Sequence, residues 1–204
     1  EEEAAHALLS LDVDAWARVA WIQWDFGGRR KHIWDRERGL VKVTRGDVDV
    51  WLRVSNRTGV AKRAGVRLEG DAAKAALNEA WQMWINDSFW LNPFPKLFDS
   101  GVRRRITDSG ALIVEFSSGG VTPGDVYLIE VDPDGRPRSW KMWVSIIPLG
   151  GLEASWDDWD QLESGAYVSQ HHDIAFLDLE LTDVRSGPSL MKAFQSDPFA
   201  PLVP

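Results

Sequence analysis

The sequence predicts an α+β fold, mainly β, in which a curved antiparallel sheet forms an unclosed barrel and helices cover its concave face. Short segments with alternating apolar and polar residues, separated by Gly- and Pro-containing turns, recur along the chain. One long amphipathic helix interrupts them near the middle. With 204 residues, 44% hydrophobic and 26% charged, and no linker or repeat, we expect one domain over 1–204 that ends in a proline-rich tail from about 196.

The first quarter of the chain predicts two short helical segments and then a meander of strands. Residues 2–10 are typical of a short helix, and "DVDAWARVA" begins a second one with Asp12 or Asp14 as its cap. "AWIQWDF" and "RKHIWDRE" then alternate around Gly27-Gly28. "LVKVTR" and "VDVWLRV" follow around Gly46-Asp47, which predicts a second hairpin.

The segment "GDAAKAALNEAWQMWIND" predicts the long helix, over residues 71–87. Asp71 is a good N-cap residue, and Asn86-Asp87 is expected to end the helix. An apolar stripe at three- and four-residue spacing needs a covering surface, which the concave face of the sheet would provide; it consists of Leu77, Ala80, Trp81, Trp84 and Ile85.

The next segment, "SFWLNPFPKLF", is apolar but contains Pro93 and Pro95, which forbid a regular helix. We expect it to cross the open side of the sheet as an extended strap. More strands follow in "VRRRIT", "ALIVEFSS", "DVYLIEVD", "RSWKMWVS", "LEASWDDWDQL" and "DIAFLDLELTDV", with a β-turn at "DPDG", residues 132–135. The tail "SDPFAPLVP" is either docked or mobile.

Twelve Trp residues make apolar binding the best-supported chemistry. Trp140 and Trp143 lie on opposite faces of one predicted strand, so one of them can face the helix and strap. These aromatic residues either line a cavity for an apolar ligand or fill the core, and the sequence leaves both possibilities open. The candidate ligand-binding residues are Trp81, Trp84, Phe89, Trp90, Leu91 and Phe94, with Trp140 or Trp143 opposite them.

Other chemistries find little support in the sequence. The chain has no Cys, no G-x-S-x-G nucleophile motif and no Gly-rich phosphate loop, so we expect no catalytic residue and no cofactor. His171 and His172 are adjacent in a predicted strand and point to opposite faces, so they cannot easily share a metal ion. Asp157, Asp158 and Asp160 lack the spacing of a calcium loop. We therefore expect no metal site.

Charge is segregated along the chain, whose net charge is -8. Twelve Lys or Arg stand against four acids between residues 29 and 67, whereas residues 151–184 hold nine acids and no Lys or Arg. The basic charges alternate with apolar residues in strands and the whole chain is acidic, so we expect solvated strand faces and no nucleic acid partner. A surface that binds lipid headgroups is the alternative.

The order of motifs resembles uncharacterised bacterial envelope proteins related to the LolA/LolB group of lipoprotein carriers. The likeness covers roughly residues 12–185 and is carried by "HIWDRERGLVKV", "NDSFWLNPFPKLFDSGV", "VTPGDVYLIEVDPDGRPRSWKMWV" and "SWDDWDQLESGAYVSQHH". The resemblance implies an open, strongly curved antiparallel sheet with helices over its concave side. In LolA-like carriers the cavity between them receives lipid acyl chains, and many relatives are exported or lipid-anchored.

We therefore expect a non-enzymatic cell-envelope protein, in the periplasm or at the outer membrane, that binds a lipid or another apolar ligand. A structural or protein-interaction module with a filled core is one alternative. An enzyme that uses the same cavity, with His171 or His172 paired to a carboxylate, is another. The sequence begins at Glu1 rather than Met, so we expect that a leader was processed or is missing from this sequence. A lipid-bearing Cys, which would allow peripheral membrane association, would lie in that missing part. We expect a monomer.

Overall fold

The computed structural model describes residues 13–117, 124–145 and 150–202, and the helix predicted at 2–10 lies outside these ranges. The second helical segment is α2 (Val13–Ala17), in agreement with the prediction.

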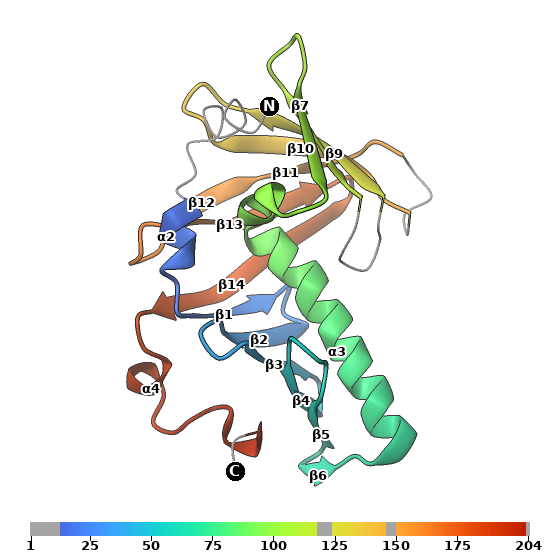
Figure 1. The fold of residues 1–204 in the computed structure, drawn as a ribbon, viewed down its shortest axis with the longest axis vertical. Helices are drawn as coiled ribbons and strands as arrows, with labels where there is room; N and C mark the ends of the chain where they lie inside the picture. The colour runs from blue at the N-terminus through green and yellow to red at the C-terminus, as the bar shows by residue number, and fades with distance from the viewer. Residues whose placement is uncertain (1–12, 118–123, 146–149, 203–204) are drawn as a thin grey trace.

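Within the described residues, fourteen antiparallel strands form one sheet (Figure 1). The strands at the two ends of the order, β6 and β7, do not pair with each other, so the sheet is unclosed, as predicted. In spatial order the strands are β6 (Val66–Arg67), β5 (Gly59–Arg63), β4 (Val48–Arg53), β3 (Leu40–Arg45), β2 (Arg30–Asp35), β1 (Trp21–Phe26), β14 (Leu177–Gly187), β13 (Tyr167–Ile174), β11 (Leu152–Ser155), β10 (Pro137–Trp143), β9 (Asp125–Val131), β8 (Leu112–Phe116) and β7 (Val102–Ile106), while β12 (Asp157–Gln161) pairs with β13.

Two meanders make up this sheet, and the pairing of β1 with β14 joins them. The first is β1 to β6, and its turns fall at the predicted glycines: Gly28 and Gly46 have positive φ angles of 67° and 58°. In the second meander, the Gly135 N–H donates to the Asp132 carbonyl oxygen at 2.8 Å, which confirms the β-turn predicted at 132–135.

The long helix is α3 (Gly70–Leu91), and the prediction of its end was wrong. The helix continues past Asn86-Asp87 because the Asp87 carboxylate binds side chains of the sheet rather than the backbone of its own helix. It ends where Asn92, which precedes Pro93, takes an extended conformation with φ -165° and ψ 101°. The prediction of the N-cap was also wrong, because Asp71 lies in the first turn and Glu69 takes the cap position.

Helix α3 lies across one face of the sheet, called the inner face here (Figure 1). Its buried side chains include Trp81 and Trp84, and the Trp84 ring meets the Trp34 ring edge-on at 5.1 Å between centroids. Gly59 of β5 permits the close approach of α3 to the sheet, since a Cβ atom there would lie 2.9 Å from the Leu77 side chain and 2.0 Å from the Trp51 carbonyl oxygen. The apolar stripe of the helix is thus covered by the sheet.

A buried carboxylate anchors α3 to β2. Asp87 has a fully buried side chain, and its Oδ2 atom lies 2.7 Å from His32 Nε2 and 2.9 Å from Arg30 Nε. Its Oδ1 atom accepts a hydrogen bond from Asn86 Nδ2 at 3.0 Å. The His32 ring stacks on Trp24 at 4.5 Å between centroids. Because both donors come from one strand, Asp87 fixes the position of this helical turn on the sheet.

The segment after α3 is not extended, contrary to the sequence prediction. Phe94–Phe98 form a 3-10 helix, η1, with Pro95 in its first turn, where the missing N–H of proline removes no hydrogen bond. Two contacts hold it: Asn92 Nδ2 donates to the Tyr167 carbonyl oxygen at 2.7 Å, and the Arg104 guanidinium donates to the Leu97 carbonyl oxygen. We call residues 92–98 the strap.

The C-terminal segment docks on the opposite, outer face of β1 to β4. It contains a short helix that the sequence did not predict, α4 (Leu190–Ala193), and a 3-10 turn, η2 (Ala200–Leu202). Trp51 Nε1 donates to the Pro198 carbonyl oxygen at 2.8 Å, Arg38 pairs with Asp197 at 2.7 Å, and Phe199 is fully buried. Of the two states considered for the proline-rich tail, the structure shows the docked one.

We predict that Phe199→Ala lowers the free energy of unfolding by about 3–5 kcal/mol, because it leaves a cavity between the tail and the sheet. Urea denaturation of both proteins measures the difference. Phe176→Ala is the matched control: this side chain is 93% exposed, and its loss should cost less than about 0.5 kcal/mol. Equal effects of the two substitutions would contradict the docked tail.

We also predict that stability falls as the pH drops below about 6.5. Burial lowers the pKa of His32 in the folded protein, although its hydrogen bond to Asp87 opposes this. Between the lowered folded pKa and the unfolded value, the unfolded chain binds a proton that the folded chain does not, so stability falls with pH by about 1.4 kcal/mol per pH unit. Above the unfolded pKa this loss is absent.

The variant His32→Gln tests this pH dependence, because Gln keeps an N–H donor for Asp87 but does not titrate. Urea denaturation between pH 5 and 8 gives the free energy of unfolding at each pH. In the variant this free energy should change less steeply with pH, by the equivalent of about one bound proton. An unchanged slope would show that His32 does not carry the effect.

Candidate functional site

The most concentrated group of aromatic side chains lies where α3 and the strap meet the second meander. All its members are joined by ring contacts with centroids 4.5–6.3 Å apart. We call it the aromatic cluster, and it consists of Phe89, Trp90, Phe94, Phe116, Tyr127, Trp140, Trp156, Trp159 and His172.

Trp140 of β10 lies at the centre of the cluster. Its ring centroid is 4.7 Å from that of Trp156, 4.8 Å from Tyr127 and 5.2 Å from Trp90. Strand alternation explains this position, because Trp140 and Met142 share the buried face of β10 while Lys141 points away. Helix α3 and the strap thus contribute the aromatic rings on one side of the cluster, and the sheet contributes those on the other side.

His172 contributes the one imidazole of the cluster. It is fully buried, 4.5 Å from the Trp156 ring and 5.1 Å from the Trp90 ring between centroids. Burial lowers its pKa to about 4, so the ring is neutral at pH 7. The Ser155 carbonyl oxygen can only accept, so His172 Nδ1, 3.0 Å away, carries the proton. This tautomer leaves Nε2 without a proton, and Nε2 has no hydrogen-bond partner among the described residues.

Two indole N–H groups in the cluster are buried without an acceptor among the described residues, those of Trp140 and Trp156. Trp159 differs, because its Nε1 donates to the Pro137 carbonyl oxygen at 3.1 Å. Buried donors are nearly always satisfied in proteins, by protein groups, water or a ligand. The cluster therefore offers two donors to an acceptor atom that enters it.

The structure divides the eight predicted binding residues into three groups. Phe89, Phe94 and Trp140 belong to the aromatic cluster, and Trp90 contacts both this cluster and the core under α3. The second group, Trp81, Trp84 and Leu91, belongs to the hydrophobic core under α3, which is separate from the cluster. The third is Trp143, which is 44% exposed on the other face of β10 beside Gly150.

Sequence reasoning did not place Phe116, Tyr127, Trp156, Trp159 or His172 in the site. Alternation in β9 was a usable signal, because Tyr127 and Ile129 share its buried face. The cross-strand partners gave no usable signal, since nothing in the sequence indicates that β13 pairs with both β11 and β14.

The two histidines considered for metal binding or catalysis lie on opposite faces of β13, as the sequence predicted. His172 faces the aromatic cluster and forms its hydrogen bond with a backbone carbonyl, not with a carboxylate. His171 lies on the outer face, where its Nε2 atom is 3.0 Å from Asp178 Oδ1. Its side chain is 25% exposed. The structure therefore puts the imidazole–carboxylate pair and the aromatic cluster on different faces.

A small polar groove of about 140 Å³ lies elsewhere, on β1 to β3 and β14. Lys31, Ile33 and Lys42 line it from the outer face, and Trp24 and His32, whose rings are buried on the inner face, contribute to its floor. It shares no residue with the aromatic cluster. The full lining is Gln23, Trp24, Lys31, His32, Ile33, Lys42, Thr44 and Asp183.

Comparison with known proteins adds little. No protein-family model and no curated protein matches the chain. A similar solved structure is a domain from Vibrio parahaemolyticus described as an outer membrane lipoprotein-sorting protein; it shares 10% identity over 87% of this chain and 91% of that chain, with a TM-score of 0.34. A TM-score this low does not place two chains in one fold family. In the described part of the chain, no helix is long and apolar enough to cross a membrane.

We predict that Trp140→Ala lowers the free energy of unfolding by about 3–5 kcal/mol, because Trp140 is 1% exposed at the centre of the cluster. Trp143→Ala, three residues away on the other face, is the matched control and should cost less than about 1 kcal/mol. Urea denaturation measures both, and Trp140→Phe extends the series if the alanine variant does not fold. Similar losses at both positions would be inconsistent with this packing.

Proposed function

We propose that this chain is a non-enzymatic protein of the cell envelope that binds an apolar ligand with an acyl chain between the inner face of the sheet and the helix–strap segment. In this proposal α3 covers the concave face of a strongly curved, unclosed sheet. The observation that carries the proposal is the aromatic cluster. The strap covers part of this cluster, and the cluster contains two buried indole N–H groups without acceptors.

A ligand has to replace ring–ring contacts, because the cluster rings already touch one another. Entry therefore requires the strap to move away from the sheet, together with the Phe89 and Trp90 rings of α3. The strap is held by hydrogen bonds of Asn92 and Arg104 to carbonyl oxygens and by the buried side chains of Phe94 and Leu97. Such bonds contribute about 0.5–3 kcal/mol each, the larger value for a charged donor, whereas apolar burial yields about 25 cal/mol per Å². An acyl chain that buries a few hundred Å² offsets that cost.

The unsatisfied donors indicate which ligands fit best. An acyl chain with a carbonyl or carboxylate group would place apolar carbons against the rings and an acceptor near Trp140 or Trp156. A pure hydrocarbon would leave both donors unsatisfied. Fatty acids and acyl esters, including those of a lipid or lipoprotein, are therefore the favoured class.

The envelope location rests on the sequence resemblance to LolA/LolB-like carriers. With it we propose a monomer that associates peripherally with a membrane through a lipid anchor.

A second candidate function is a protein-interaction module whose aromatic residues form a filled core. The short centroid distances support it, because the described rings are in direct contact with one another. Ligand binding distinguishes the two functions, since a filled core takes no acyl chain.

We predict that delipidated protein binds a fluorescent fatty acid saturably, at about one per chain. Trp90→Ala should weaken this binding at least about tenfold, because Trp90 contacts Trp140, Trp156 and His172 in the cluster. Trp143→Ala is the matched control, with the same side chain removed from the other face, and should bind within about twofold of the original protein.

Circular dichroism and thermal unfolding establish that both variants are folded. Absence of saturable binding, or equal weakening by the two substitutions, would sink this proposal in favour of the filled core.

A further inference from the structure

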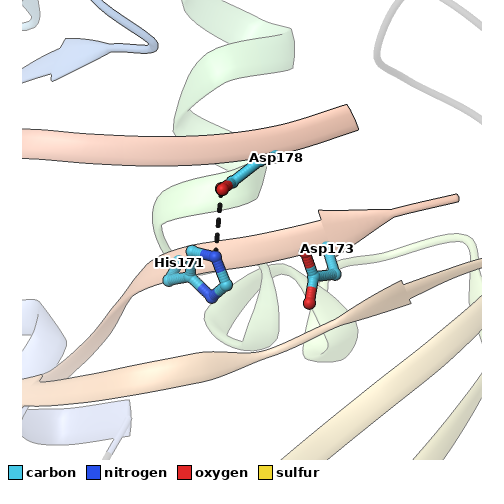
Figure 2. Close-up of side chains that lie close together, drawn as sticks. All are labelled: His171, Asp173 and Asp178. Carbon is cyan, nitrogen blue, oxygen red and sulfur yellow. Dashed lines mark hydrogen bonds and ion pairs between the residues drawn. The ribbon is translucent and has the colours of Figure 1, made fainter. Parts of the chain in front are cut away.

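A second cluster, on the outer face of the β13–β14 hairpin, combines one imidazole with carboxylates. His171 and Asp173 are two residues apart on β13 and therefore share a face. Across the hairpin, Asp173 is paired with Asp178 and His171 with Glu180. Figure 2 shows the His171 ring and the Asp178 carboxylate in contact between the two strands, with Asp173 farther along the His171 strand.

Two carboxylates face each other in this register without a cation between them. Like charges directly opposite each other on neighbouring strands destabilise a sheet. Among the described residues, the Asp173 carboxylate has no hydrogen bond or ion pair, and residues 151–184 contain no Lys or Arg to neutralise it. Asp157 adds another negative charge, with its Oδ2 atom 3.7 Å from His171 Nδ1. Apart from His171, the described residues of the cluster thus supply no compensating positive charge.

The donor atoms are close enough to share one metal ion. One ligand atom each from His171, Asp173 and Asp178 can be chosen so that all three lie within 4.8 Å of one another. Zinc bonds to imidazole nitrogen and carboxylate oxygen are about 2.0–2.2 Å long, which places neighbouring ligand atoms roughly 3.3 Å apart in a tetrahedron. The Asp178 side chain is 69% exposed, so it can rotate by the small amount required.

We propose that His171, Asp173 and Asp178 form a zinc site with one coordination position open to water. The imidazole nitrogen favours a borderline ion such as Zn²⁺ over Ca²⁺ or Mg²⁺, which prefer oxygen ligands only. Asp157, beside His171 Nδ1, orients the ring while Nε2 binds the metal. The ion neutralises the facing carboxylates and clamps the hairpin near its tip.

This site is independent of the acyl-chain site. His171 and the aromatic cluster lie on opposite faces of β13, so a ligand in one does not touch the other. Zinc binding can therefore fail while fatty acid binding succeeds, and the reverse.

Calorimetric titration of untagged protein with Zn²⁺ tests the proposal. We expect one Zn²⁺ per chain, and at least about tenfold weaker binding in His171→Ala and in Asp178→Asn. Asp158→Asn is the matched control: it removes one charge from the same acidic segment, outside the cluster, and should leave the affinity within about twofold. Circular dichroism verifies that each variant is folded.

A crystal soaked in zinc and measured at the zinc absorption edge should show an anomalous peak between His171 and Asp178. The proposal is wrong if no Zn²⁺ binds, or if binding is unchanged in His171→Ala. Binding of Ca²⁺ alone, lost in Asp178→Asn but kept in His171→Ala, would also overturn it, because it would show a site made of carboxylates.

Discussion

The buried carboxylate of Asp87 determines how the long helix sits on the sheet. A buried charge is tolerated only beside close partners of β2: His32 Nε2 forms a hydrogen bond with Asp87 at 2.7 Å, and Arg30 Nε forms an ion pair with it at 2.9 Å. These contacts fix both the rotation of α3 and its height along β2. One further turn of helix then carries Phe89 and Trp90 beyond the first meander and onto the second. The aromatic cluster therefore depends on an ionic contact in a different part of the core.

Because side chains alternate between the two faces of a strand, β13 contributes one histidine to the aromatic cluster and one to the outer cluster. His172 faces inward, where burial lowers its pKa to about 4 and keeps it neutral beside Trp156. His171 faces outward, where the nearby Asp178 carboxylate helps to raise its pKa against the effect of burial. Adjacent residues of one type thus differ in pKa and in neighbours because the strand turns each side chain to the opposite face.

Much of the sheet could be predicted because its signals are local. Alternation and turn glycines located most strands of both meanders, and the "DPDG" turn formed as expected. The sequence did not predict β5, β6 or the turn between β13 and β14 inside "DIAFLDLELTDV". The end of α3 could not be predicted in this way. Asn86-Asp87 is a reasonable stop by local propensity, but the partner of Asp87 is His32, 55 residues earlier in the chain. A tertiary contact overrode the local preference and added a turn of helix.

The candidate site was predictable only in part for a similar reason. Trp140 was placed correctly relative to Trp143 because both lie on one strand. Trp156 and His172 reach the same cluster through strand pairings that connect distant segments, and the sequence does not specify these pairings. The outer cluster has the same origin: Asp173 and Asp178 meet through the register of the β13–β14 hairpin. Residue patterns show which face a side chain takes, whereas the register decides its neighbours.

The distribution of contacts also indicates where the inner face would open. Lifting α3 would separate Asp87 from its donors, and breaking a buried charged pair costs about 3–5 kcal/mol. The strap is held by the Asn92 and Arg104 hydrogen bonds to carbonyl oxygens and by the packing of Phe94 and Leu97. Pro93 already interrupts the backbone hydrogen bonding between α3 and η1. Displacing the strap after Leu91 leaves the helix anchored at Asp87 and removes the Phe94 ring from Trp156 and Trp159.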